Sequence, residues 1–186
     1  MSLRTSSQPG FGYSSFALDE GTLWGLWGGL DRINHGGQVV KRTTKLLEPF
    51  AVAAGEGAVW VLDGALRSVM RVDPATDTVV NRLQLRFEPG GIAVCGGSVW
   101  VTNPSGDNVV RIDPRSNRTV GSTRVGRDPV GVVCGEGSLW VANYLEGTVS
   151  RIDAHTGSFV KTISVGPYPA TLATGLGEVW VGVRAA

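Results

Sequence analysis

An all-β fold built from repeated four-stranded antiparallel sheets is predicted by two residue types that recur in one 40-residue frame. Tryptophan and proline each occur four times at intervals of 40 residues. A tandem repeat of about this length is typical of a short list of architectures, which includes the β-propeller. The tryptophans are Trp60, Trp100, Trp140 and Trp180, and the prolines are Pro49, Pro89, Pro129 and Pro169.

The frame divides the chain into about four and a half repeats. The two units before the reference unit, residues 129–168, align with it without gaps, and the first unit aligns after a few deletions. The sequence therefore predicts an N-terminal extension, residues 1–12, followed by a single β-propeller domain, residues 13–186. The repeats are residues 13–48, 49–88, 89–128 and 129–168, with a half repeat at 169–186.

Each repeat contains four short apolar runs of strand length. They are rich in Val, Ile and aromatic residues, and no stretch carries helical spacing over two turns. Residues that tolerate positive φ, such as Gly135-Glu136-Gly137, separate the first two runs. A four-stranded sheet that is apolar on both faces must be covered by copies of itself, which is how β-propeller blades pack. In the reference unit the runs are Val130–Cys134, Ser138–Asn143, Thr148–Asp153 and Phe159–Val165.

The second strands carry a resemblance to a known family. Trp100-Val101-Thr102-Asn103 and Trp140-Val141-Ala142-Asn143, each followed by Arg-Ile-Asp, resemble the YVTN-type bacterial β-propeller repeat, with Trp replacing its leading Tyr. The endings Val125-Gly126-Arg127-Asp128-Pro129 and Val165-Gly166-Pro167-Tyr168-Pro169 match that repeat's closing motif. The resemblance implies a β-propeller. Its relatives are often extracytoplasmic and include binding modules, sensor domains and a few enzymes.

Four and a half repeats leave the closure of the propeller open to three interpretations. The chain is a piece of a longer propeller, or two chains share a ring. Alternatively, strands from residues 169–186 complete a sheet with residues 29–47 and displace residues 13–27. We therefore expect an incomplete or oligomer-completed ring, and homo-oligomers are a prospect because open strand edges invite association.

The composition of the chain restricts the kinds of partner that we expect. The net charge is +1 and the charges do not cluster into a basic stripe, so we expect no nucleic-acid partner. No run of eighteen apolar residues is present, so we expect no membrane span. The first twenty residues lack the apolar core of a signal peptide; the chain is cytoplasmic or a leader has been removed, and its compartment is unknown.

The two cysteines, Cys95 and Cys134, occupy frame positions that differ by one residue. We expect small buried side chains with free thiols, because this offset does not promise the Cβ geometry of a disulfide. Neither cysteine belongs to a Cys/His cluster, so no zinc site is expected.

Two sets of loops are expected to share the face that lines the mouth of a propeller channel. They join the second strand to the third and the fourth strand to the next repeat. Polar side chains that converge there are typical of a ligand site. The alternative for Asp63, Asn103 and Asn143 is that they only end their strands through Asx hydrogen bonds. The candidate ligand-binding residues are Trp27, Asp63, Arg67, Asn103, Asp107, Asn143, Tyr144, Glu146, Arg127 and Tyr168.

Other recurring residues are interpreted as structural. The repeated tryptophans are expected to pack blade against blade with the indole N–H bonded locally. Arginines that precede an aspartate by two residues are expected to form Arg–Asp pairs, within a strand or between blades. These residues are Trp60, Trp100, Trp140, Trp180, Arg71, Asp73, Arg111, Asp113, Arg151 and Asp153.

No catalytic residue or metal ligand is predicted. The histidines, His35 and His155, fall in the turns between third and fourth strands, opposite the loops considered above. The resembling virginiamycin B lyase family uses histidine and glutamate with magnesium at the channel mouth, which these histidines would not reach. We expect a non-enzymatic scaffold that binds a protein or small-molecule ligand without a cofactor. The alternatives are a lyase or hydrolase of that type, which would need magnesium, and a structural or engineered fragment without ligand.

Overall fold

The computed structural model describes residues 15–43 and 45–184, whose regular elements are β-strands and one 3₁₀ turn. The predicted all-β propeller class is confirmed, because the strands form four-stranded antiparallel blades. The expected N-terminal extension, residues 1–12, lies outside the described residues. The chain divides into two compact units, one ending at Gln84 and the other beginning at Leu85.

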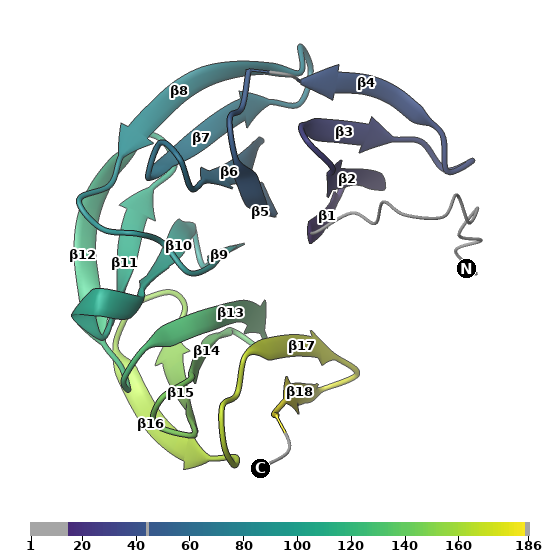
Figure 1. Ribbon diagram of the computed structural model, residues 1–186. Coiled ribbons are helices and arrows are strands. Elements are labelled where there is room, and N and C mark those ends of the chain that lie inside the picture. Colours follow the sequence, from purple (N-terminus) through teal and green to yellow (C-terminus); the bar gives the residue numbers. More distant parts are fainter. Residues whose placement is uncertain (1–14, 44, 185–186) are drawn as a thin grey trace. The chain divides into compact units, whose positions relative to one another are not determined.

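The first unit holds two blades whose strands follow one another in sequence order across each sheet (Figure 1). One blade consists of β1 (Ser15–Asp19), β2 (Thr22–Leu26), β3 (Leu30–Ile33) and β4 (Val39–Thr43). The other consists of β5 (Pro49–Gly55), β6 (Ala58–Asp63), β7 (Ser68–Asp73) and β8 (Thr78–Gln84).

The second unit holds two further blades and a two-stranded sheet. Its first blade consists of β9 (Ile92–Cys95), β10 (Ser98–Asn103), β11 (Asn108–Asp113) and β12 (Arg118–Arg124), with the 3₁₀ turn η1 (Pro104–Gly106) after β10. Its second blade consists of β13 (Pro129–Gly135), β14 (Ser138–Asn143), β15 (Thr148–Asp153) and β16 (Phe159–Ser164). The two-stranded sheet consists of β17 (Thr171–Gly175) and β18 (Glu178–Gly182). The strands of the reference repeat differ from their predicted bounds by one residue at most.

The pairing of the strands excludes one of the three interpretations of how the propeller closes. β1 and β2 belong to the same sheet as β3 and β4, and β17 pairs with β18 in a sheet of their own. The prediction that residues 169–186 displace residues 13–27 is therefore wrong. The hairpin of β1 and β2 has its own Leu-Trp-Gly-Leu second strand, and its Trp24 and Leu26 are buried in the core of the first unit.

In each unit the inner strands of a blade are more buried than its fourth strand. β6 is buried along its whole length, whereas β8, β12 and β16 are mostly exposed. In the second unit, Trp100 and Val109 of one blade pack with Leu139, Val141 and Ile152 of the next. Burying side chains of this size stabilises a fold by about 1.5–3 kcal/mol each, so the apolar second and third strands hold neighbouring blades together.

The recurring arginines stack on the recurring tryptophans. The indole N–H groups of Trp60, Trp100 and Trp140 each donate to a backbone oxygen five residues earlier at 3.2 Å, namely that of Gly55, Cys95 or Gly135. The guanidinium carbons of Arg71, Arg111 and Arg151 lie 5.6, 5.3 and 5.2 Å from the ring centroids of Trp60, Trp100 and Trp140. Such cation–π contacts are typical of arginine beside tryptophan. Trp180, on β18, is 46% exposed.

The expected Arg–Asp pairs are not formed by Arg71, Arg111 or Arg151 among the described residues, whereas Arg32, in the same frame position of the first repeat, pairs with Asp77 of the next blade at 3.4 Å. Arg111 donates to the Ser98 hydroxyl at 2.7 Å and, across to the next blade, to the carbonyl of His155 at 2.9 Å. Asp153 instead turns into the loop that follows its strand and accepts the N–H groups of Thr156 and His155. The Thr156 N–H is the main cause that lowers the pKa of Asp153 below its ordinary 3.8.

Cys95 and Cys134 form a disulfide, so the prediction of free thiols is wrong. Neighbouring first strands are displaced by one residue along their length. The same displacement places a Cβ built on Gly135, the seventh residue of its repeat, 2.6 Å from the Cβ of Thr174, the sixth residue of the next. Cys95 and Cys134 are likewise the seventh and sixth residues of adjacent repeats, and their Cα atoms are 6.1 Å apart. This separation lies within the usual range for a disulfide.

Candidate functional site

The candidate residues of the first unit lie at the ends of its second strands or in the loops that lead to its third strands. Asp63 is buried, and its carboxylate accepts the backbone N–H groups of Leu47 at 2.8 Å and Leu66 at 3.1 Å. It thereby fastens two loops and has the Asx role that was the alternative to ligand binding. Arg67 is exposed, and its backbone oxygen accepts a hydrogen bond from Gln84. Trp27 is 43% exposed, with the guanidinium of Arg42 5.2 Å from the centroid of its ring.

In the second unit, Asn103 and Asp107 hold the loop that contains the 3₁₀ turn. The Asn103 side chain donates to Asn108 at 3.4 Å and accepts from the hydroxyl of Ser105 at 3.1 Å. Asp107 accepts the N–H of Asp128 at 3.1 Å, which ties this loop to the one that enters the next blade. Both side chains therefore organise the loops on which other candidates lie.

Asn143, the last residue of β14, is buried and organises the loop that follows it. Its amide donates to the hydroxyls of Thr148 and Ser150, each at 2.9 Å, and its backbone oxygen accepts the N–H groups of Glu146 and Gly147. Its side-chain oxygen is buried and accepts no hydrogen bond from the described residues. Asn143 thus supports the turn, residues 144–147, from inside.

The turn contributes Tyr144 and Glu146 to a surface feature that we call the loop site. The loop site is an open depression of about 410 Å³ lined by Tyr144, Leu145, Glu146, Gly147, Ser164, Gly166, Pro167 and Tyr168. The rings of Tyr144 and Tyr168 lie 5.2 Å apart with an angle of 41° between their planes. Tyr168 is 46% exposed and Leu145 is 55% exposed, so apolar surface is open to solvent beside the rings.

Charged groups border the loop site on two sides. One carboxylate oxygen of Glu146 accepts the backbone N–H of Arg127 at 2.9 Å, and the Arg127 guanidinium donates to the carbonyl of Leu145 at 3.5 Å. The guanidinium of Arg184 lies 6.0 Å from the centroid of the Tyr144 ring. An aromatic pair flanked by a carboxylate and two guanidinium groups can stack on a flat ligand and hydrogen-bond its edges.

Four of the predicted residues come together at the loop site: Tyr144, Glu146, Arg127 and Tyr168. Four others hold loops in place through hydrogen bonds: Asp63, Asn103, Asp107 and Asn143. Arg184 and Leu145 were not among the residues predicted from the sequence. A signal for Arg184 exists, because it follows Tyr144 by 40 residues and so takes the same frame position in the half repeat. Leu145 has no such signal.

Comparison with known proteins supports the fold. No protein-family model and no curated protein sequence matches this chain. A glutaminyl cyclase structure from Myxococcus xanthus matches with a TM-score of 0.63 and 14% identity, over 91% of this chain and 84% of that one. A streptogramin B lyase structure matches with a TM-score of 0.63 and 14% identity, over 94% of this chain and 77% of that one. A functionally unknown protein from Desulfotomaculum acetoxidans matches with a TM-score of 0.80 and 13% identity, over 94% and 64%.

At these identities the similarity establishes the β-propeller fold alone, because unrelated functions share this architecture. Within the described part of the chain, no helix has the length and hydrophobicity needed to cross a membrane.

Proposed function

We propose that this chain is a non-enzymatic β-propeller scaffold that binds a protein or small-molecule ligand through the loop site. The observation that carries the proposal is the Tyr144–Tyr168 pair, half-buried at Tyr144 and exposed at Tyr168, on the wall of an open depression. Contiguous apolar surface that is open to solvent and rimmed by polar groups is typical of interaction sites, and the rings of this pair lie beside the exposed Leu145. The volume, about 410 Å³, lies in the range of small-ligand sites.

The chemistry of the loop site favours a ligand with a flat apolar face and polar edges, such as a sugar ring or an aromatic side chain. The two tyrosine rings supply the stacking surface. Glu146 and the guanidinium groups of Arg127 and Arg184 supply hydrogen bonds of both polarities. No cofactor is required for such binding.

The test is ligand-observed NMR with a library of hexose and phenyl fragments. Saturation transfer to a subset of fragments is expected for the unmodified chain and should be lost in the Tyr144→Ala, Tyr168→Ala double variant. Phe159→Ala is the matched control, since Phe159 is also exposed but lies on β16 away from the depression. Equal transfer in the double variant, or none in the unmodified chain, would contradict the proposal.

The alternative is a lyase of the virginiamycin B lyase type, favoured by the match to the streptogramin B lyase structure. His35 and His155 lie in the β3–β4 and β15–β16 turns, whereas the loop site is built from other loops. Magnesium-dependent ring opening of a streptogramin B, together with a magnesium-dependent rise in melting temperature, would establish this activity in place of simple binding.

Self-association is a further expectation. β18 pairs with β17 along one edge, and its other edge makes no ladder with the described residues. Open edges of this kind are templates for pairing with another chain. Native mass spectrometry should show dimers or larger species that dissociate when Val179 and Val181 of β18 are replaced by proline. A monomer at all concentrations would contradict this expectation.

A further inference from the structure

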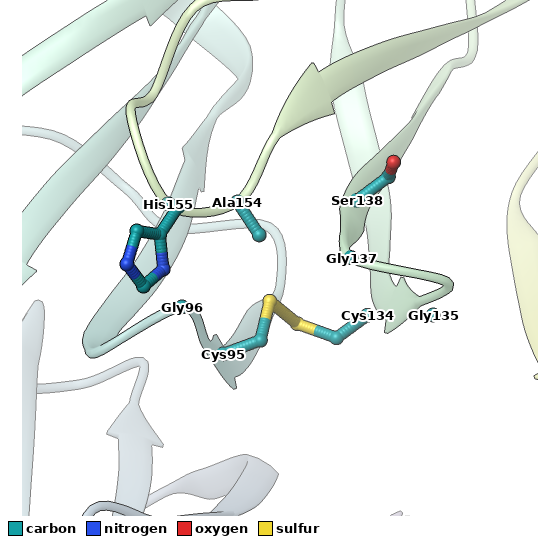
Figure 2. Close-up of a pocket in the computed structure, with 8 residues that line it drawn as sticks. All are labelled: Cys95, Gly96, Cys134, Gly135, Gly137, Ser138, Ala154 and His155. Atoms are coloured by element: carbon teal, nitrogen blue, oxygen red, sulfur yellow. A yellow bond between two sulfur atoms is a disulfide. The ribbon is translucent and has the colours of Figure 1, made fainter.

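The Cys95–Cys134 disulfide forms part of the wall of an open cavity in the second unit (Figure 2). The cavity has a volume of about 320 Å³ and is completed by Ser138, by glycines of two hairpins and by the turn that contains His155. Both cysteines are half-buried. A disulfide in the wall of an open cavity can be approached by a thiolate, which is the first requirement for thiol–disulfide exchange.

His155 lines the same cavity and can supply a proton to the leaving sulfur. Its backbone is fixed, because its N–H donates to Asp153 at 3.0 Å and its carbonyl accepts from Arg111 at 2.9 Å. Its imidazole is exposed, makes no hydrogen bond with the described residues, and lies on the Cys95 side of the cavity (Figure 2). Histidine is a common proton donor in proteins near neutral pH.

We propose that Cys95–Cys134 is a thiol–disulfide exchange site that accepts a small-molecule thiol as a mixed disulfide on Cys134. The incoming thiolate attacks Sγ of Cys134, and a sulfur–sulfur bond forms between them as the Cys95–Cys134 bond breaks. The electron pair leaves on Sγ of Cys95, which takes a proton from the His155 imidazolium. A second thiolate then attacks the sulfur of the first thiol, releasing the two thiols as their disulfide and Cys134 as a thiolate.

In the complete exchange, two external thiols reduce the protein disulfide by two electrons and are themselves oxidised to a disulfide. Its structural consequence falls on β9 and β13, which the disulfide joins. β9 is short and pairs with β10 over four residues. Loss of the covalent link should therefore loosen β9 first, while the hydrogen bond from Thr102 to the carbonyl of Val130 continues to join the two blades.

The test treats the native full chain with glutathione, quenches with iodoacetamide and maps both cysteines by peptide mass spectrometry. We expect glutathione on Cys134, carbamidomethyl on Cys95, and a rate that does not change with urea below the unfolding transition. His155→Asn and His155→Gln should slow the reaction about a hundredfold, the low end of general acid catalysis. His35→Asn is the matched control, because His35 lies in the corresponding turn of a blade without cysteine.

Each contrary result overturns the proposal. Reaction only under conditions that unfold the chain would show a disulfide that native thiols do not reach. Glutathione on Cys95 would reverse the assigned leaving group. An unchanged rate in both folded His155 variants would remove the proton donor. Reaction with thioredoxin but not with glutathione would show that the site takes a protein thiol.

Discussion

Removal of the disulfide offers a stability prediction whose magnitude follows from the chain between the cysteines. Cys95 and Cys134 are separated by 39 residues. A closed loop of about 40 residues restricts the unfolded chain by about 13 cal/mol/K, or about 4 kcal/mol at 25 °C. Serine is close to cysteine in size and both sites are half-buried, so replacement should add little cost of its own. The Cys95→Ser, Cys134→Ser variant should therefore unfold with a free energy about 4 kcal/mol lower.

Urea unfolding followed by tryptophan fluorescence measures this difference. With a typical dependence of about 2 kcal/mol per molar urea, the midpoint should fall by about 2 M. The unmodified chain in excess dithiothreitol should unfold at the same midpoint as the double variant, which controls for effects of the serines. Equal midpoints for the oxidised chain and the double variant would refute the reasoning, because the disulfide would then not reduce the conformational entropy of the unfolded chain.

The remaining predictions concern packing and pH. Trp100→Phe should lower the unfolding free energy by about 2 kcal/mol, because it removes a buried indole and its hydrogen bond. Trp180 is half-exposed, so Trp180→Phe should change the unfolding free energy by less than about 0.5 kcal/mol. The midpoints of urea unfolding check both values. Gly131→Ala should cost about 1–3 kcal/mol by the same assay, because its Cβ would collide with the carbonyl of Ala170. Asp153 has a pKa below 3.8 in the folded chain, so its stabilising effect is present above that pH and is lost as pH falls through the folded pKa. Asp153→Asn keeps an acceptor that does not titrate, so its unfolding midpoint should depend less on pH between 5 and 2 than that of the unmodified chain.

The blades were predictable because their signals are local. Strand length, alternation and turn chemistry recur in every repeat, and Ser138–Asn143 and Thr148–Asp153 were located to the residue. The Glu136-Gly137 turn has φ of 51° and 67°, as a two-residue hairpin between right-twisted strands requires. These properties depend on neighbours in sequence, so one chain suffices to detect them.

The loop site was predictable only in part. Asp63 and Asn143 share a frame position with Asn103, and the sequence assigned all three the same alternatives. Asp63 and Asn143 are buried, whereas Asn103 and Tyr144 are half-buried and Tyr168 is exposed. Burial depends on how a loop folds back over its strand, which the repeat frame does not show. The 5.2 Å contact of Tyr144 with Tyr168 joins the β14–β15 loop to the β16–β17 loop. The sequence predicted that both loops share one face, but repeat spacing does not determine which side chains on that face touch.

The disulfide shows how a repeat frame can mislead when its positions are treated as facing their equals. Neighbouring first strands in the second unit are displaced by one residue, so the third residue of one repeat meets the second residue of the next. Gly91 faces the carbonyl of Val130 in this way, and Gly131 faces that of Ala170. Both close approaches require glycine, since a Cβ would enter the facing carbonyl. A cysteine pair offset by one residue in adjacent repeats is therefore the arrangement that this displacement can bridge, and two cysteines at identical positions would be the harder pair to join.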